Sequence, residues 1–177
     1  MENARYTRTA MALHWLMAVL LLAQIGIGLY MVDIPKRTPP VAFYYGLHKS
    51  LGLTAMALLL VRLWWKSRHP APSLAGLALS ALQIEAARIS HRMLYACMLF
   101  TPICGFVASN FTRHGVSFFG IALPRLGWED QALHLLFSRM HAGFAWLLCA
   151  LIALHVLAAL GHVLKSGTLV VRRMLPR

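Results

Sequence analysis

Acidic side chains are scarce in this sequence: only five of its 177 residues are Asp or Glu, and charged residues of both signs make up 12% of the chain. A water-soluble domain averages about 25% charged residues, so an ordinary soluble globule is excluded. The 17 Lys and Arg give a formal net charge of +12, which in a soluble protein would suggest a nucleic-acid partner. Here the basic residues lie between apolar runs, so we expect contact with membrane lipids and none with nucleic acid.

Cysteine is also rare. Cys97, Cys104 and Cys149 lie in or beside apolar stretches without paired spacing, so we expect no disulfide framework. The chain lacks a C-x-x-C-H motif, which excludes covalent attachment of a c-type haem. Nine histidines, by contrast, are many for a chain that is 59% hydrophobic. The histidines are therefore the main candidates for function.

Four segments are long and apolar enough to cross a membrane, which requires about 20 residues for roughly 30 Å of hydrocarbon. They run over residues 10–31, 43–65, 90–110 and 140–164. Residues 73–89 contain Gln83, Glu85 and Arg88, which indicates an amphipathic interfacial segment that leads into the third span. Residues 115–136 mix aromatic residues with Gly and Pro, so we predict a loop pressed on the membrane surface.

The arrangement of the spans follows from their connections and charges. Residues 32–42 contain three prolines, which break the helix and make the first two spans antiparallel neighbours. Four spans place both termini on one side, which carries eleven Lys and Arg against six on the other. The positive-inside rule assigns that side to the cytoplasm. The sequence therefore predicts an all-α, four-helix transmembrane bundle, a single domain over residues 1–177, with both termini cytoplasmic.

Four histidines match in depth across the spans. His141 and His155 are fourteen residues apart in the fourth span, so they project from one face, about 21 Å apart along the helix. His14 lies near the cytoplasmic start of the first span, level with His155. His48 lies near the external start of the second span, level with His141. Two inward-facing histidines at one level are what a six-coordinate b-type haem requires, with its iron between two imidazoles, so the sequence predicts two haems stacked across the membrane.

Other interpretations of these histidines compete with haem. A lone intramembrane His can hydrogen-bond a backbone carbonyl, and a series of His can serve a transporter. The predicted spans contain no Asp or Glu, which favours haem over a hard metal or a proton path. His91 and His162, at the cytoplasmic ends of the third and fourth spans, could each replace an inner ligand.

The remaining histidines and the glycines are less informative. Gly52 follows His48 by one turn, and a small residue there would let a macrocycle approach the helix. Glycine is also common in spanning helices for helix packing alone. We expect three histidines to be solvated outside the spans: His69, His114 and His134.

Short motifs follow one another along nearly the whole chain. They are Met1-Glu2-Asn3 with Arg8, His14-Trp15, Gly46-Leu47-His48-Lys49-Ser50-Leu51-Gly52, Val61-Arg62-Leu63, His91, Pro102 with Gly105, and the His141 to His155 spacing followed by His162 and Arg173-Met174-Leu175-Pro176. In this order the chain resembles the bacterial cytochrome b561 family. These are small four-helix dihaem membrane cytochromes, related to the b subunits of nickel hydrogenases.

The resemblance implies that His14, His48, His141 and His155 are axial ligands of two non-covalent haem b groups. In this interpretation Gly52 and Lys49 also contribute to binding the cofactor. The resemblance further implies electron transfer across the bacterial inner membrane, with ubiquinone as the expected acceptor. A related member oxidises superoxide at the outer face, so we expect a membrane oxidoreductase of the superoxide:quinone type.

Two sets of residues are hypotheses about substrates. Outer basic side chains would neutralise propionates and steer an anionic donor such as superoxide; they are Lys49, Arg113, Arg125 and Arg139. Three residues at the cytoplasmic side would bind a quinone headgroup: His91, Arg92 and His162. The alternative function is a haem-bearing membrane anchor that relays electrons for a separate dehydrogenase or hydrogenase. The expected protein partners are therefore that separate enzyme or, for so small a bundle, a second copy of this chain in a homodimer.

Overall fold

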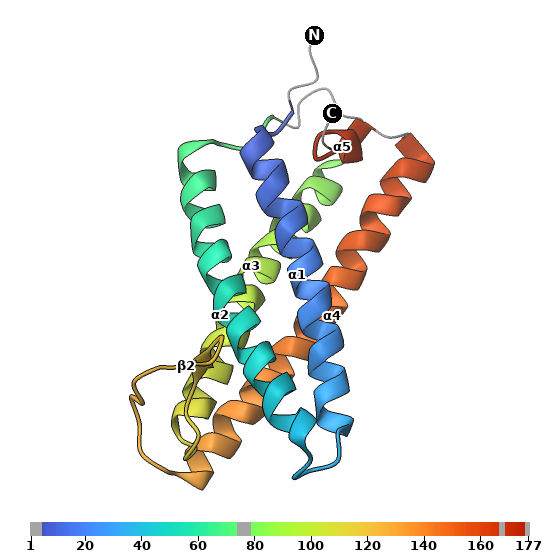
Figure 1. Ribbon diagram of the computed structural model, residues 1–177. Helices are drawn as coiled ribbons and strands as arrows, with labels where there is room; N and C mark the ends of the chain where they lie inside the picture. The colour runs from blue at the N-terminus through green and yellow to red at the C-terminus, as the bar shows by residue number, and fades with distance from the viewer. Residues whose placement is uncertain (1–4, 74–78, 167–168, 176–177) are drawn as a thin grey trace.

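The computed structural model describes residues 5–73, 79–166 and 169–175, and it shows four long helices side by side (Figure 1). They are α1 (Arg8–Asp33), α2 (Pro39–Arg68), α3 (Ala81–Asn110) and α4 (Gln131–Ser166), and the short α5 (Leu169–Arg172) follows. Each long helix is long and apolar enough to span a membrane, so the predicted all-α architecture with four spans is confirmed. The start of α1 and the short α5 lie at the same end of the bundle (Figure 1).

The bundle consists of two packed helix pairs. Helix α1 packs mainly against α2, and α3 packs mainly against α4, while α2 and α3 share a smaller contact. Leu94 and Cys97 of α3 and Leu148 of α4 form the buried cluster, against which Leu21 of α1 also packs. All three cysteines are free. The pair α1–α2 therefore meets the pair α3–α4 through few buried apolar residues of the described chain.

Helix α3 begins earlier than the sequence predicts. Ser80 forms a capping box with Gln83: each side chain bonds the backbone N–H of the other residue. Such a box satisfies N–H groups that the first helical turn leaves unpaired. Residues 81–89 therefore lead into the third span as part of the same helix, and their position at the membrane interface stays a prediction; residues 74–78 lie outside the described part of the chain. Glu85 forms an exposed ion pair with Arg88.

Helix α4 also begins before the predicted start of the fourth span. The Asp130 carboxylate accepts a hydrogen bond from the backbone N–H of Leu133 at 3.0 Å, which is the bond expected of a helix-capping side chain. Residues 131–136 are consequently helical rather than part of a loop. His134 lies in this added turn, half-buried, and its Nδ1–H donates to the carbonyl of Ala108 on α3 at 3.0 Å. The expectation that His134 is solvated is therefore wrong.

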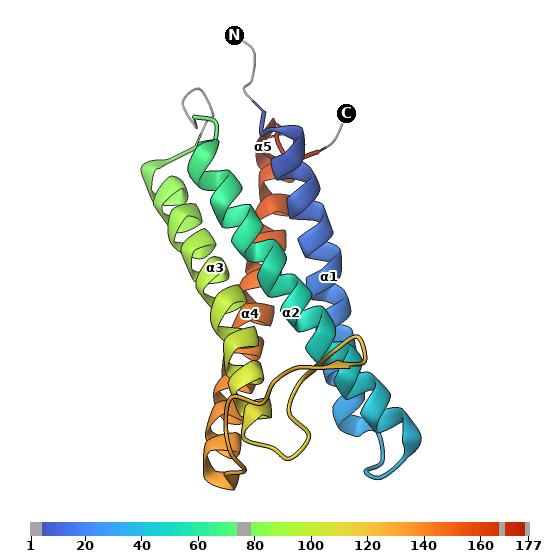
Figure 2. The ribbon, with the colours of Figure 1, turned by 60° about the vertical axis from the view of Figure 1, so that its left-hand side comes forward.

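The connection between α3 and α4 folds back against α2 (Figure 2). It contains a two-stranded hairpin, β1 (Ser117–Phe118) and β2 (Ile121–Ala122). Ser50 of α2 is almost fully buried, and its hydroxyl accepts a hydrogen bond from Phe119 N–H at 2.9 Å. The ammonium of Lys49 donates to the carbonyl of Gly115 at 2.8 Å. These two bonds fix the connection over the start of α2, beside His48.

Candidate functional site

His48 of α2 and His141 of α4 face each other near the connection between α3 and α4; we call them the loop-side pair. Their ring centroids are 6.1 Å apart and their planes differ by 84°. The Nδ1–H of His141 donates to the carbonyl of Thr101 on α3 at 2.8 Å. A carbonyl can only accept, so this bond places the proton on Nδ1 and leaves the lone pair of Nε2 available to a metal.

Two glycines make room for the rings of this pair. A Cβ at Gly105 would lie 2.8 Å from His141 Nδ1, and a Cβ at Gly28 would lie 3.2 Å from His48 Cε1. Gly52 has a different neighbour, because its Cβ would lie 3.0 Å from Nε2 of Gln24. The structure thus assigns close approach to the rings to Gly28 and Gly105, whereas Gly52 accommodates Gln24.

Polar atoms around the loop-side pair lack partners within the described chain. Gln24 Nε2 donates to the carbonyl of His48 at 3.0 Å, but Gln24 Oε1, His48 Nδ1 and Thr101 Oγ1 are buried without a hydrogen bond among the described residues. Unpaired buried polar groups are costly and usually indicate a missing water, ion or ligand. These orphaned atoms and the two facing imidazoles fit a bound haem, because bis-imidazole ligation is one of its common donor sets.

His14 of α1 and His155 of α4 form a second pair, the terminal-side pair, near the end of the bundle that carries both termini. Their ring centroids are 6.3 Å apart. The two sites lie at different levels, since His141 and His155 are fourteen residues apart on α4, about 21 Å along the axis. Helix α4 therefore supplies one imidazole to each pair, while α2 and α1 supply the partners.

The spacing of both pairs suits one metal ion between two rings. An imidazole nitrogen binds a transition metal at about 2.0–2.1 Å, and the ring centre lies about 1.1 Å behind that nitrogen, so two coaxial ligands have centroids about 6 Å apart. The loop-side and terminal-side pairs measure 6.1 and 6.3 Å. His91 lies closer to His155, with centroids 5.3 Å apart. The pairing of His14 with His155 therefore suits a shared iron better than that of His91 with His155.

The three residues of the predicted quinone site lie at different distances from the terminal-side pair. The ring of His91 contacts His155, and its Nδ1–H donates to the carbonyl of Ala87 one turn earlier in α3. Arg92 follows on α3 and is exposed. His162 is half-buried one heptad beyond His155, about 10 Å further along α4. The structure thus brings His91 to the pair and leaves His162 one level away.

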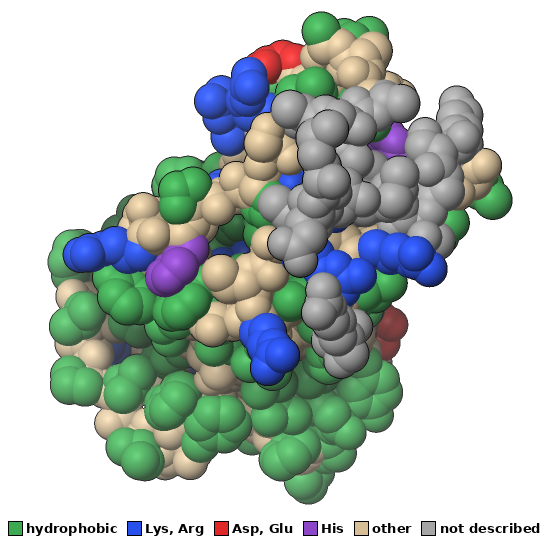
Figure 3. Space-filling model, turned by 90° about the horizontal axis from the view of Figure 1, so that it is seen from above, with side chains coloured by type: hydrophobic (Ala, Val, Ile, Leu, Met, Phe, Trp, Pro, Cys, Tyr) green, Lys and Arg blue, Asp and Glu red, His purple; other side chains and the backbone are tan. Residues whose placement is uncertain are grey.

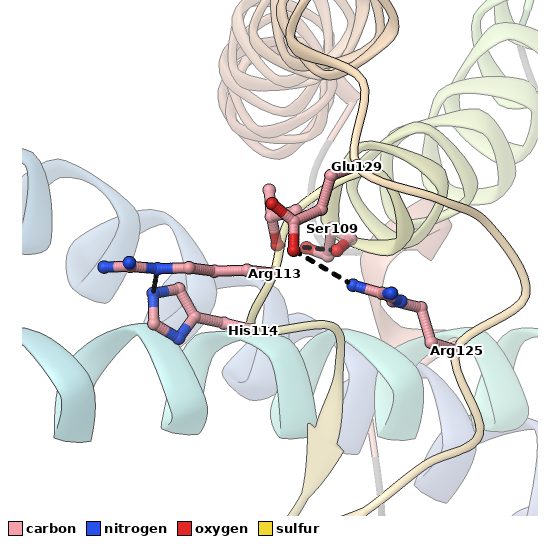
Figure 4. Close-up of polar contacts among 6 residues, drawn as sticks. Ser109, Arg113, His114, Arg125 and Glu129 are labelled. Carbon is pink, nitrogen blue, oxygen red and sulfur yellow. Dashed lines mark hydrogen bonds and ion pairs between the residues drawn. The ribbon is translucent and has the colours of Figure 1, made fainter.

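The predicted anion-steering residues are spread over the loop side. Arg113 donates from Nε to His114, and Arg125 forms an ion pair with Glu129 at 3.5 Å (Figure 4). Lys49 donates to a backbone carbonyl, which leaves its charge uncompensated. Arg139 is exposed on α4. Of the four predicted residues, Arg125 alone has an acidic partner within the described chain.

Four side chains beside the histidine pairs were not predicted as site residues. Gln24 and Thr101 border the loop-side pair, and Tyr95 and Arg62 border the terminal-side pair. Arg62 was named in the Val61-Arg62-Leu63 motif and counted among the cytoplasmic charges, but it was given no role at a site. The signal that could have selected it is its position within the second span, because ionisable residues at membrane depth are costly and usually functional.

Comparisons with a family model and with individual proteins all match cytochrome b561 proteins over nearly the full length of the chain. The family model for prokaryotic cytochrome b561 matches residues 5–177. The chain is 29% identical over 181 aligned positions to cytochrome b561 homolog 2 of Escherichia coli strain K12, covering 97% of this chain and 91% of that protein. It is 27% identical over 175 positions to cytochrome b561 homolog 1 of the same organism, covering 98% of both chains.

Proposed function

The chain belongs to the prokaryotic cytochrome b561 family of membrane-bound, electron-transferring b-type cytochromes, and we propose that it binds two haem b groups and passes electrons across the membrane. The loop-side pair would hold one haem and the terminal-side pair the other. The observation that supports this proposal is the matched spacing of the two histidine pairs, 6.1 and 6.3 Å. We place the termini in the cytoplasm, so the loop side is the outer side.

The chain's own residues orient and enclose each site. When bound, haem supplies a one-electron carrier at each level of the membrane. The carbonyl of Thr101 fixes the tautomer and direction of the His141 ring, and Gly28 and Gly105 leave space for the two rings. The connection between α3 and α4, bonded to Lys49 and Ser50, lies over this side of the bundle. An electron that enters at the loop side and leaves at the terminal side crosses the membrane.

The haem content of the purified chain tests this proposal. We expect a b-type reduced-minus-oxidised spectrum and two haems per chain by pyridine haemochrome in protein expressed with ample haem. One haem per chain would mean that one histidine pair does not ligate iron, and none would overturn the proposal. Turnover with small donors and quinone by the purified chain alone would separate this function from that of an anchor subunit, which needs its dehydrogenase.

We propose superoxide as the outer donor and the basic residues of the loop side as the groups that attract it. The charges of Lys49, Arg113 and Arg139 lack an acidic partner in the described chain. Such steering weakens with salt, because the Debye length falls from about 30 Å at 0.01 M to about 10 Å at 0.1 M. The rate of haem reduction by superoxide should therefore fall steeply over that range, while reduction by an uncharged donor stays constant. A salt-independent superoxide rate would exclude steering.

We propose that ubiquinone is reduced near the terminal-side pair, with His91, Arg92 and His162 around its headgroup. The contact of His91 with His155 supports this position. A His91→Ala chain should keep both haems and lose most of its quinone reduction, measured as reoxidation of the prereduced protein. His69→Ala is the matched control, because His69 is an exposed histidine stacked on Trp65 at the same end. Equal reoxidation rates in the two variants would remove His91 from the site.

A further inference from the structure

Arg62 places a guanidinium between three helices beside the terminal-side pair. It belongs to α2, about 9 Å along the axis from the end of that helix at Arg68. Its Nη2 lies 3.2 Å from Nδ1 of His14 on α1, and its Nε donates to the hydroxyl of Tyr95 on α3 at 3.1 Å. Lys66, one turn later, lies over the ring of Tyr95 at 4.6 Å. Two cations thus converge on Tyr95, and one of them, Arg62, also contacts His14.

No acidic side chain of the described chain balances Arg62. The ion pairs among the described residues join Arg88 to Glu85 and Arg125 to Glu129. Asp33 ends α1, and Glu129 and Asp130 precede α4, so all three belong to the opposite end of the bundle. Seen from the end that carries the termini, Lys and Arg side chains are prominent and acidic atoms few (Figure 3). A half-buried guanidinium in a membrane span without a counter-ion is costly, which indicates that an anion binds it.

The contact between Arg62 and His14 is incompatible with a metal-bound His14. Arg is always a donor, so this contact requires a lone pair on Nδ1 and places the ring proton on Nε2. If iron binds Nε2, the neutral ring carries its proton on Nδ1 and can no longer accept from Arg62. If iron binds Nδ1 instead, that lone pair is consumed. In either case Arg62 loses this acceptor when His14 becomes a ligand.

We infer that Arg62 then pairs with a carboxylate of the terminal-side haem, while Tyr95 continues to hold its Nε. This inference rests on the proposed function, because the carboxylate is a propionate of the group that His14 and His155 would bind. A guanidinium matches a carboxylate in a two-bond geometry. The Tyr95 hydroxyl keeps Arg62 on the same side of His14. Rotation about the outer side-chain bonds of Arg62 is then sufficient to move its guanidinium from His14 to the carboxylate. Arg62 is thus a positioning residue that fixes the haem and raises its reduction potential.

A redox titration of both haems in Arg62→Gln tests this inference. Loss of the positive charge should lower the reduction equilibrium constant of one haem about tenfold, equivalent to about 59 mV for one electron. The affected haem should be the one that a His155→Ala chain lacks. Arg62→Lys should retain most of the potential, because it keeps the charge. Arg68→Gln removes an exposed charge from the same helix and should leave both potentials unchanged.

Other outcomes separate the inference from the proposed function. Wild-type protein without haem would overturn both. Two haems in wild type with unchanged potentials in Arg62→Gln would overturn only the role of Arg62. If that variant also lost copurified phospholipid, the anion would be a lipid phosphate instead. Should Arg62→Gln fail to fold, Tyr95→Phe keeps the charge but releases Nε, and it should lower the potential of the same haem by a smaller amount; an unchanged potential there would contradict the inference.

Discussion

A His48→Ala chain is expected to purify with one haem b instead of two, and His155→Ala is expected to lose the other. His48 and His155 contribute to different pairs at different levels of the bundle, so in the proposed function each substitution would remove one of the two imidazoles from one site only. The double variant His48→Ala/His155→Ala should carry none. Pyridine haemochrome gives the stoichiometry, and redox titration shows which of the two potentials disappears.

His114→Ala is the matched control for the loop side, since His114 is an exposed histidine of the same face; its haem content should equal that of wild type. Loss of haem through general misfolding can be separated from loss of a ligand by adding imidazole to a His48→Gly chain. A free imidazole can occupy the space left by the side chain and restore the second haem. Two haems with unaltered spectra in His48→Ala would exclude His48 as a ligand.

Among the glycines that the structure describes, Gly105 is the one where an alanine is expected to weaken haem binding most, because its Cβ would make the shortest contact. Its Cβ would lie 2.8 Å from His141 Nδ1, so the imidazole must move and its bond to the Thr101 carbonyl is strained or lost. Partners that orient a metal-ligating histidine typically contribute 10- to 100-fold to metal affinity. We therefore expect haem at the loop side to bind about 10- to 100-fold more weakly, while the terminal-side haem is retained.

Gly143→Ala is the control for this substitution. Gly143 lies on α4 two residues after His141, and a Cβ there would meet nothing within 4 Å. Alanine in a helix interior is favoured over glycine by about 1 kcal/mol, so Gly143→Ala should bind haem normally and unfold at the same or a higher temperature in detergent. Haem titration of the haem-free proteins compares the two. Equal haem affinity in both variants would show that His141 tolerates displacement, and that Gly105 is present only for helix packing.

Hydropathy was sufficient to predict the four spans, because a continuous apolar run of about 20 residues is most stable as a helix that crosses the membrane. Depth along each helix was sufficient to pair the histidines, because rise per residue is constant in an α-helix. The helix starts were missed, since they depend on polar caps such as Ser80 with Gln83 that lie outside any apolar run. Arg62 was missed for a related reason: its role depends on Tyr95 and His14, which only the tertiary structure brings to it.

Helix α4 has a consequence for the order of assembly. It is the last long helix in the chain, and each histidine pair includes one of its residues. While the ribosome has delivered only the first three spans, His14 and His48 therefore have no partner across the bundle. In the proposed function, cofactor capture at either level would follow insertion of the fourth span. Both cofactors would then connect the helix pair α1–α2, which is made first, to the pair α3–α4, which is made last. Maturation of the two sites would therefore depend on one common step, the insertion of α4.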